Sequence, residues 1–344
     1  MKQKTLLPLL QAIRAEEIHS ITVVWIGRLG DVIVATPFLR GLKERFPAAR
    51  IRLLVSYRSA EVLSLIPFID EGLVLGKPTE VIRHASLFYA LFRPCDLVID
   101  LNPSFSKTAS LLCRMMRAPF KLSFEKTRAK EIYNYAVSRA EDEEPMLRRY
   151  ERLAQALGAP YEPRLELSVS QDDRVQANQI FDSLPKRQGA SFRILVHMGN
   201  FKRESSCWRG DFFTRLIKEI LENTAVDVYC LAGPGEKQKT QEILNQAALS
   251  IPVISSVPLG VLAALMGKMN LFFCNTTGTT HLAIAVGTPT FAIHTGYTYA
   301  IWNTGGKKDY AFKSEDWNSC RDVPYEEIRI PLLEMIKNLQ YPRI

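Results

Sequence analysis

Residues 271–296, LFFCNTTGTTHLAIAVGTPTFAIHTG, contain a complete strand–helix–strand unit. The apolar run Leu271–Cys274 predicts a buried strand, and a polar turn and a short helix follow it. Gly287 ends that helix before a second apolar run, Thr290–His294. Two short strands joined through a helix are typical of a parallel pair with a right-handed crossover. This stretch therefore indicates an α/β fold built on a parallel sheet.

The same alternation of strands and helices recurs in both halves of the chain. The repetition predicts two doubly wound, Rossmann-like domains that face each other across a cleft, with ligands at the carboxyl ends of the strands. The further strands expected are Ile21–Ile26, Ile51–Val55, Leu73–Leu75, Leu97–Leu101, Arg193–His197, Val226–Leu231 and Val253–Ser255, with helices near Phe212–Glu222 and Glu236–Ala247.

The join between the halves is predicted in residues 158–170, GAPYEPRLELSVS, which contain two prolines and a glycine. This segment separates a helix at Met146–Leu157 from a polar helix at Gln171–Leu184, so we expect domains at 1–165 and 166–344. The final amphipathic segment is Tyr325–Leu339. Pro331 inside it predicts that the helix proper begins near that residue, with an apolar face able to pack back on the first domain.

Composition sets limits on function. The 344 residues carry a net charge of +8, and 47% of them are hydrophobic and 23% charged, as in soluble globular proteins. No apolar run reaches the roughly 18 residues of a membrane span, and the start does not resemble a secretory signal. The six cysteines form no CxxC pair, which favours reduced, buried thiols in a cytoplasmic protein over disulfides or zinc ligands.

The first 60 residues are strongly basic, with ten Lys or Arg against four acids. Such an excess favours anionic partners, namely nucleic acid, a phospholipid surface or a phosphorylated acceptor, although a solvated basic face is an equal alternative. The amphipathic start, with Leu6, Leu10 and Ile13 among Lys2, Lys4 and Arg14, could rest on an anionic membrane or pack on the protein body. A nucleic-acid role is the weakest of these hypotheses, because no aromatic–basic interleaving accompanies the charge.

The first candidate site follows the strand Ile21–Ile26, in Gly27-Arg28-Leu29-Gly30-Asp31. Glycines permit a sharp turn there, and Asp31 would lie at the carboxyl end of the strand beside the next helix. Its carboxylate could cap that helix or accept a proton from a substrate hydroxyl. The segment lacks the G-x-G-x-x-G spacing of dinucleotide-binding proteins.

The second candidate site is the turn Asn275–Thr280, which places hydroxyls and N–H groups at a helix N-terminus. Such an end suits a phosphate or diphosphate, while the alternative is a set of helix caps without a ligand. His281, in the first turn, could donate to a phosphate oxygen or serve as a structural donor.

A third set of candidates lies in two further loops. The loop after Arg193–His197 contains Gly199, Asn200, Lys202 and Arg203; its cations could stabilise a leaving diphosphate or belong to an ordinary solvent loop. Glu236 begins the helix after Gly233-Pro234-Gly235, where it could bind ribose hydroxyls or favour the helix dipole. The chain contains no P-loop, G-x-S-x-G or H-E-x-x-H motif and no metal-ligand spacing.

In their order along the chain, these motifs resemble glycosyltransferase family nine, the ADP-heptose:lipopolysaccharide heptosyltransferases. The resemblance covers about residues 21–300. The residues that carry it are Gly30-Asp31-Val32 with Thr36-Pro37 and Leu39, the stretch CDLVIDLNPS at 95–104, Gly233–Glu236, Thr277-Gly278 with His281-Leu282-Ala283, and Gly287-Thr288-Pro289.

This resemblance implies a GT-B fold whose first domain binds the acceptor and whose second binds the nucleotide sugar. It implies an inverting, metal-independent reaction without a cofactor, with Asp31 as general base in a turn that includes Arg28 and Gly30. The donor residues would be Thr276, Thr277, Gly278, Thr279 and His281 at the diphosphate, Glu236 near the ribose, and Gly199, Asn200, Lys202 and Arg203 nearby. The acceptor would be an anionic lipopolysaccharide core or a related bacterial glycan, held at the cytoplasmic face of the inner membrane.

Two positions depart from the family pattern. Thr276 stands where an acid usually precedes the Thr/Ser-Gly pair, and Ser206 stands where a lysine usually lies two residues before Trp208. Lys202 or Arg203 could replace the missing cation. An altered sugar donor is the first interpretation, and a non-catalytic nucleotide-sugar-binding protein is the second. For the chain as a whole, heptose transfer is the leading hypothesis, a non-catalytic protein is the second, and an epimerase or hydrolase on a similar scaffold is the third.

Overall fold

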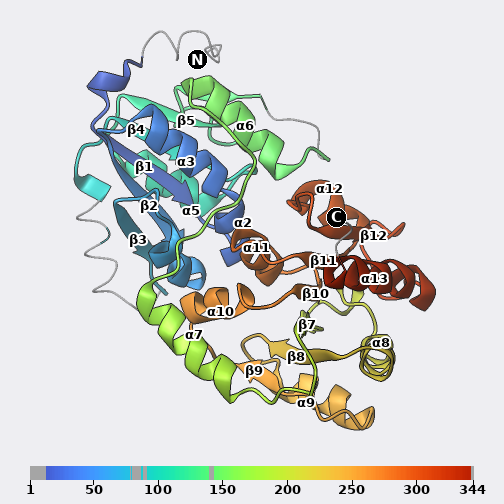
Figure 1. Ribbon diagram of the computed structural model, residues 1–344. Coiled ribbons are helices and arrows are strands. Elements are labelled where there is room, and N and C mark those ends of the chain that lie inside the picture. Colours follow the sequence, from blue (N-terminus) through green and yellow to red (C-terminus); the bar gives the residue numbers. More distant parts are fainter. Residues whose placement is uncertain (1–12, 78, 80–86, 88–90, 139–142, 342–344) are drawn as a thin grey trace. The chain divides into compact units, whose positions relative to one another are not determined.

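The computed structural model describes residues 13–77, 79, 87, 91–138 and 143–341. The chain divides into two compact units, Met1–Ser168 and Val169–Ile344. Each unit is built on a six-stranded parallel sheet with helices packed against it (Figure 1). The division falls inside the proline-containing segment 158–170.

The first sheet has the strand order β3-β2-β1-β4-β5-β6, and all neighbours are parallel. Its strands are β1 (Ser20–Trp25), β2 (Arg50–Ser56), β3 (Glu71–Leu75), β4 (Leu97–Asp100), β5 (Phe120–Phe124) and β6 (Tyr135–Val137). The helical segments of this unit include η1 (Ala15–Glu17), α2 (Leu29–Val34), α3 (Thr36–Arg45), η2 (Tyr57–Leu65), α5 (Lys107–Met115) and α6 (Met146–Leu157).

The second sheet has the order β12-β11-β10-β7-β8-β9, again parallel throughout. Its strands are β7 (Phe192–His197), β8 (Val226–Ala232), β9 (Val253–Ser255), β10 (Leu271–Asn275), β11 (Thr290–His294) and β12 (Tyr310–Lys313). The helices are α7 (Gln171–Ser183), η3 (Glu204–Ser206), α8 (Gly210–Asn223), α9 (Lys237–Gln246), α10 (Leu259–Met266), α11 (Gly278–Ala285), α12 (Gly296–Trp302) and α13 (Tyr325–Gln340).

Both sheets have the same topology, because numbering each set of six strands from its own start gives the order 3-2-1-4-5-6. This is the Rossmann order, in which the chain reverses direction across the sheet between strands 1 and 4. Ligands bind outside the carboxyl ends of the strands at that switch point. The switch points lie between β1 and β4 in the first unit and between β7 and β10 in the second.

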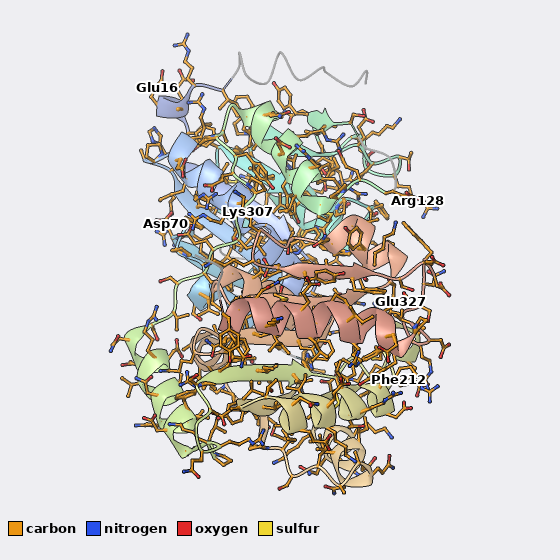
Figure 2. All side chains as sticks on the ribbon, turned by 45° about the vertical axis from the view of Figure 1, so that its right-hand side comes forward. Glu16, Asp70, Arg128, Phe212, Lys307 and Glu327 are labelled. Atoms are coloured by element: carbon orange, nitrogen blue, oxygen red, sulfur yellow. The ribbon has the colours of Figure 1, made fainter. Side chains whose placement is uncertain are left out.

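Each sheet is covered by apolar helix faces. In the first unit, Leu112 and Cys113 of α5 pack on Val24 and Val98 of the sheet. In the second, α8 and α13 share one core with β7, β8, β10 and β11. Charged side chains such as Arg128 and Glu327 point away from the sheets (Figure 2). The strands are therefore buried on both faces, as their apolar runs predicted.

The expectation that the last helix begins near Pro331 is wrong. Helix α13 starts at Tyr325, directly after Pro324, and runs through Pro331. Its apolar face explains this, because Tyr325 and Ile328 precede the proline and are buried in the core of the second unit together with Leu332. Burial of that whole face outweighs the single backbone hydrogen bond that an internal proline removes.

Three strands are absent from the sequence-based expectation: β5, β6 and β12. Two helices follow β1, because α2 ends at Val34 and α3 starts at Thr36, with Pro37 in its first turn. All six cysteines are buried and unpaired, as predicted. The amphipathic start lies largely in residues 1–12, outside the described residues. Among the residues described, no helix is both long and apolar enough to cross a bilayer.

Candidate active site

The turn after β1 holds Asp31 at the switch point of the first sheet. The hydroxyls of Ser56 and Ser59 donate to the carbonyl of Gly27 at 3.1 and 2.8 Å, which fixes the turn. The N–H of Arg28 donates to Asp31 Oδ2 at 2.9 Å. A Cβ on Gly27 would lie 3.0 Å from that same oxygen, so the turn has no room for a larger residue.

The geometry of Asp31 is compatible with both roles that the sequence left as alternatives. Its Oδ2 caps α2 through Arg28 N–H, while Oδ1 has no hydrogen-bond partner among the described residues. Burial raises the pKa of this carboxyl, and the N–H and charge of Arg28 oppose that shift only in part. A carboxylate with a raised pKa and a free oxygen is suited to accept a proton from a substrate hydroxyl.

The neighbouring strand ends add positive charge to this edge. Tyr57 follows β2 directly, and its ring lies 5.5 Å from the Arg58 guanidinium carbon and 5.7 Å from Lys77 Nζ. Arg28 is exposed in the turn before Asp31. The carboxyl edge of the first sheet therefore carries three cations near its strand ends, which favours an anionic ligand.

Sequence reasoning missed a buried polar cluster at the end of β4. Asp100 is fully buried, and its Oδ1 accepts hydrogen bonds from the backbone and side-chain nitrogens of Asn102 at 2.9 and 2.7 Å. Its Oδ2 pairs with buried Lys126 and accepts from Tyr133 OH at 2.5 Å. The signals in the sequence were an acid at the end of an apolar strand and the stretch CDLVIDLNPS at 95–104. Neither indicated Lys126 or Tyr133, which lie 26 and 33 residues away from Asp100.

A hollow of about 250 Å³ adjoins this cluster. Lys126 belongs to both, and Lys130 adds a second ammonium to the wall. The hollow is lined by Pro103, Ser104, Phe105, Glu125, Lys126, Thr127 and Lys130. The buried ion pair thus fixes one wall of a polar depression at the carboxyl ends of β4 and β5.

In the second unit, the β10–α11 turn is organised by threonines. Thr277 caps α11, its hydroxyl accepting from Thr279 N–H at 3.3 Å, and its own N–H donates to Thr280 Oγ1 at 3.1 Å. Thr276 donates its hydroxyl to the carbonyl of Ile293 on β11, at 2.8 Å. An acid could not make that bond at neutral pH, so the departure at Thr276 has a structural consequence.

A buried amide holds the β7–α8 loop against β10. Asn275 is fully buried, and its Nδ2 donates to the carbonyl of Met198 at 2.9 Å. Its Oδ1 accepts the N–H of Trp208 at 3.0 Å. The ends of β7 and β10 are therefore fixed to each other at the switch point of the second sheet.

Glu236 is bonded within the site rather than exposed. Its Oε1 accepts Asn200 N–H at 2.7 Å, and its Oε2 accepts Gly233 N–H at 2.9 Å and faces His197 Nε2 at 3.0 Å. Burial alone would raise the pKa of this carboxyl, but these three bonds and the His197 charge lower it to about 2. A Cβ on Gly199 would lie 2.2 Å from Oε2, which explains the glycine.

His197 is a candidate site residue that the sequence predictions did not include. It ends β7, and its Nδ1 lies 3.0 Å from the hydroxyl of Thr279. His197 thus connects Glu236 to Thr279 in the threonine turn. A polar residue ending a buried strand at a switch point was the available signal.

The remaining predicted donor residues differ in their surroundings. His281 is buried, its Nδ1 lies 2.9 Å from Thr304 Oγ1, and burial lowers its pKa to about 4, so the ring is neutral at pH 7. Lys202 and Arg203 are exposed, and neither side chain has an ion-pair partner in the part of the chain that the structure describes. Both remain available to an anion.

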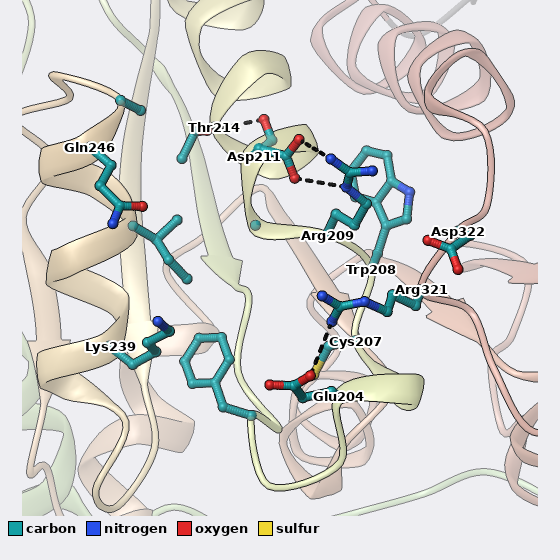
Figure 3. Close-up of a pocket in the computed structure, with 14 residues that line it drawn as sticks. Glu204, Cys207, Trp208, Arg209, Asp211, Thr214, Lys239, Gln246, Arg321 and Asp322 are labelled. Carbon is teal, nitrogen blue, oxygen red and sulfur yellow. Dashed lines mark hydrogen bonds and ion pairs between the residues drawn. The ribbon is translucent and has the colours of Figure 1, made fainter.

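A separate pocket of about 600 Å³ lies between α8, α9 and the loop before α8 (Figure 3). Its three cations are balanced by three acids: Arg209 bonds Asp211 through two nitrogens, Arg321 faces Glu204, and Lys239 and Asp322 complete the set. None of the predicted donor residues lines it. Because the wall has no excess positive charge, the threonine turn is the better diphosphate site.

In the described ranges, no three His, Cys, Asp or Glu side chains are grouped as metal ligands.

Comparison with solved structures shows the same architecture. A glycosyltransferase of family 9 from Veillonella parvula matches with a TM-score of 0.80 and 19% identity, over 93% of this chain and 97% of that one. The ADP-heptose lipopolysaccharide heptosyltransferase II of E. coli matches with a TM-score of 0.74 and 17% identity, over 93% and 99%. The chain therefore has the GT-B fold.

Comparison with known sequences gives the family. The lipopolysaccharide core heptosyltransferase OpsX of Haemophilus influenzae is 24% identical over 282 residues, which are 80% of this chain and 78% of that protein. The family model for glycosyltransferase family 9 (heptosyltransferase) matches residues 85–325. The chain belongs to glycosyltransferase family 9, the heptosyltransferases, and is a glycosyltransferase. The family expected from the motifs is confirmed.

Proposed function

We propose that this protein transfers a heptose from ADP-heptose to an anionic lipopolysaccharide core, without a metal, at the cytoplasmic surface of the inner membrane. The observation that carries the donor half of this proposal is the junction of β7, β8 and β10, where Glu236, His197 and the Thr277 cap form one hydrogen-bonded group. ADP-heptose as the donor is supported by similarity to the ADP-heptose lipopolysaccharide heptosyltransferase II of E. coli. The lipopolysaccharide core as the acceptor is supported by similarity to the core heptosyltransferase OpsX.

The diphosphate of the donor binds at the start of α11 in this proposal. Gly278 is the first helical residue, and the N–H of a first helical residue has no partner within its helix. The helix dipole adds partial positive charge at the same place. Lys202 and Arg203 replace the lysine that the family usually has at the position of Ser206, because they are exposed cations on the adjacent loop.

The acceptor binds at the carboxyl edge of the first sheet. Asp31 takes the proton of an acceptor hydroxyl, whose oxygen attacks the anomeric carbon of the heptose as the bond to the diphosphate breaks. The configuration inverts, and ADP leaves with the negative charge that the α11 turn stabilises. An anionic core requires positive charge on the protein. It is carried by Arg28, by Arg58 and by Lys130 in the wall of the 250 Å³ hollow.

Glu236 acts chiefly as a scaffold for this site. Three hydrogen bonds occupy its carboxylate, which leaves one acceptor position on Oε1 for a ribose hydroxyl. The ribose contact implied by the family resemblance is compatible with that remaining position. The main consequence of the carboxylate is the placement of Asn200 and His197.

The test is a transfer assay with purified protein and heptose-deficient lipopolysaccharide, in EDTA. ADP-heptose is compared with UDP-, GDP- and CMP-sugars, and the products are read by mass spectrometry. We expect one added heptose from ADP-heptose alone, and a rate lower by about 10²–10⁴-fold for Asp31→Asn. Transfer from another donor would overturn the heptose assignment, and donor binding without transfer would favour a non-catalytic protein.

A further inference from the structure

His197 forms the centre of a hydrogen-bonded relay that ends at the proposed diphosphate site. Its Nε2 faces Glu236 Oε2 at 3.0 Å and its Nδ1 faces Thr279 Oγ1 at 3.0 Å. The Thr279 hydroxyl in turn lies 2.7 Å from the hydroxyl of Thr277. The side chains of Glu236, His197, Thr279 and Thr277 thus form one continuous chain of hydrogen bonds. The His197 side chain is nearly fully buried.

The direction of the hydrogens is fixed at the Glu236 end. Hydrogen bonds from Asn200 and Gly233 N–H accompany the His197 contact, and the Glu236 pKa of about 2 keeps the carboxylate ionised at neutral pH. An ionised carboxylate only accepts. His197 Nε2 therefore carries a hydrogen and donates it to Glu236.

A neutral His197 turns the hydroxyls away from a ligand. With its hydrogen on Nε2, the ring has a lone pair on Nδ1, so Nδ1 accepts the hydroxyl hydrogen of Thr279. Thr279 Oγ1 then accepts the hydroxyl hydrogen of Thr277. Both threonine hydroxyl hydrogens point inward along the relay, so these two hydroxyls present only lone pairs to an incoming anion.

A protonated His197 reverses the relay. Nδ1–H donates to Thr279 Oγ1, and the Thr279 hydroxyl donates to Thr277 Oγ1. The two lone pairs of Thr277 Oγ1 are then filled by this hydrogen and by Thr279 N–H. The hydroxyl hydrogen of Thr277 has no partner left inside the relay, and it is available at the half-buried start of α11.

We propose that the donor diphosphate binds with uptake of one proton at His197, which reverses the relay and makes the Thr277 hydroxyl a donor to a phosphate oxygen. His197 is therefore a positioning residue for the donor, and it acts through Thr279. This inference rests on the proposed function, because it takes the diphosphate to bind at the α11 turn. Its consequence is a donor affinity that falls as the pH rises.

The other titratable groups around His197 keep their charge in this pH range. Glu236 remains ionised. The buried thiols are Cys274, the β10 neighbour of His197, and Cys207, which bonds the Gly199 carbonyl; burial raises the pKa of each to about 12. His281 of α11 stays neutral because burial lowers its pKa to about 4. The exposed side chains of the loop, Lys202 and Arg203, lie outside the hydrogen-bonded relay.

The experiment is isothermal titration calorimetry of the full chain with ADP-heptose between pH 6 and 8.5, in two buffers of different ionisation enthalpy. ADP itself is a poor probe, because its terminal phosphate titrates near pH 6, whereas the diphosphate diester of ADP-heptose does not. We expect uptake of up to one proton per donor at the alkaline end, and a Kd that rises by up to about tenfold per pH unit there.

Two isosteric variants separate the relay from general effects. Thr279→Val removes the hydroxyl between His197 and Thr277, so we expect donor binding without proton uptake; Thr279→Ser should keep the uptake. Thr288→Val is the matched control, because its buried hydroxyl bonds the Met266 carbonyl outside the relay. Binding by the wild type without proton uptake, or uptake that survives in Thr279→Val, would overturn the relay alone. Absence of ADP-heptose binding at every pH would instead overturn the donor assignment, and the relay with it.

Discussion

Glu236 Oε2 and His197 Nε2 lie 3.0 Å apart, although His197 ends β7 and Glu236 follows the neighbouring strand β8. The contact joins the loop before α9 to the turn before α11, because His197 also meets Thr279. Neither residue reaches the bulk solvent freely, since the His197 side chain is 4% exposed and the Glu236 side chain is 19% exposed. The region proposed to bind the donor is therefore organised by a largely buried acid–imidazole pair.

Glu236→Gln should weaken this organisation while preserving size. We expect a loss of about 1–3 kcal/mol in the free energy of unfolding at pH 7, because the amide cannot satisfy the same three donors, together with weaker ADP-heptose binding. The Glu236 pKa of about 2 lies below its ordinary 4.5, so its stabilisation is present above pH 4.5 and disappears as the pH falls towards 2.

Urea unfolding of both proteins at pH 7 and pH 3 measures this difference, which should shrink at pH 3. Glu222→Gln is the control, because Glu222 is exposed and follows no strand of the site. Equal stability of Glu236→Gln and wild type at pH 7 would contradict the scaffold role.

Asp31 should set the acidic limb of the pH–rate profile. Burial raises its pKa above the ordinary 3.8, so kcat/KM should fall with decreasing pH at a higher pH than for a solvated aspartate. Arg28→Ala removes a charge that lowers this pKa and should move the limb further upward. A limb that stays in place in Arg28→Ala would show that another group is titrating.

Asp31→Asn should lower the rate by about 10²–10⁴-fold. Burial disfavours the ionised carboxylate in the folded state, so the neutral amide should leave the melting temperature at pH 7 unchanged or slightly higher. Thermal unfolding with and without ADP-heptose checks both points. A large fall in melting temperature would indicate that Asp31 matters for the fold rather than for proton transfer.

Lys126→Met should be strongly destabilising, by about 3–5 kcal/mol, because it leaves the buried Asp100 carboxylate without its counter-ion. The double variant Asp100→Asn/Lys126→Met should recover much of that loss, since no charge then remains buried. Chemical denaturation of the single and double variants measures the coupling. Arg148→Ala, which breaks an exposed pair with Glu151, is the control and should have no measurable effect. Additive losses in the double variant would contradict a direct pair.

Gly199→Ala should impair donor binding because the added methyl would fall 2.2 Å from Glu236 Oε2 and 2.4 Å from His197 Nε2. We expect at least a tenfold loss of ADP-heptose affinity by calorimetry and a lower melting temperature. Gly267→Ala offers the comparison, because its methyl would meet the nearest atom at 3.5 Å in a helical backbone conformation. A variant Gly199→Ala that binds like the wild type would mean that the Glu236–His197 pair is not needed for the donor.

The strands that form the centre of each sheet were predicted to within two residues, because β1, β7, β10 and β11 are buried on both faces and their sequences are continuously apolar. The strands that were missed lie towards the sheet edges. β12, at one edge, is partly exposed and only four residues long, so its sequence YAFK carries little hydrophobic signal. Likewise, Pro331 misled the prediction for α13 because local propensity cannot account for tertiary burial.

The sequence by itself determined the class of fold and the family, and it indicated the loops proposed to carry the site, because apolar periodicity and short motifs are local properties of the chain. Only the tertiary structure decided which side chains meet. Along the chain, His197 lies 39 residues from Glu236 and 82 residues from Thr279. Asp100 lies 26 residues from Lys126. Such pairs form where parallel strands end side by side, and their energies depend on burial, which no local pattern of residues specifies.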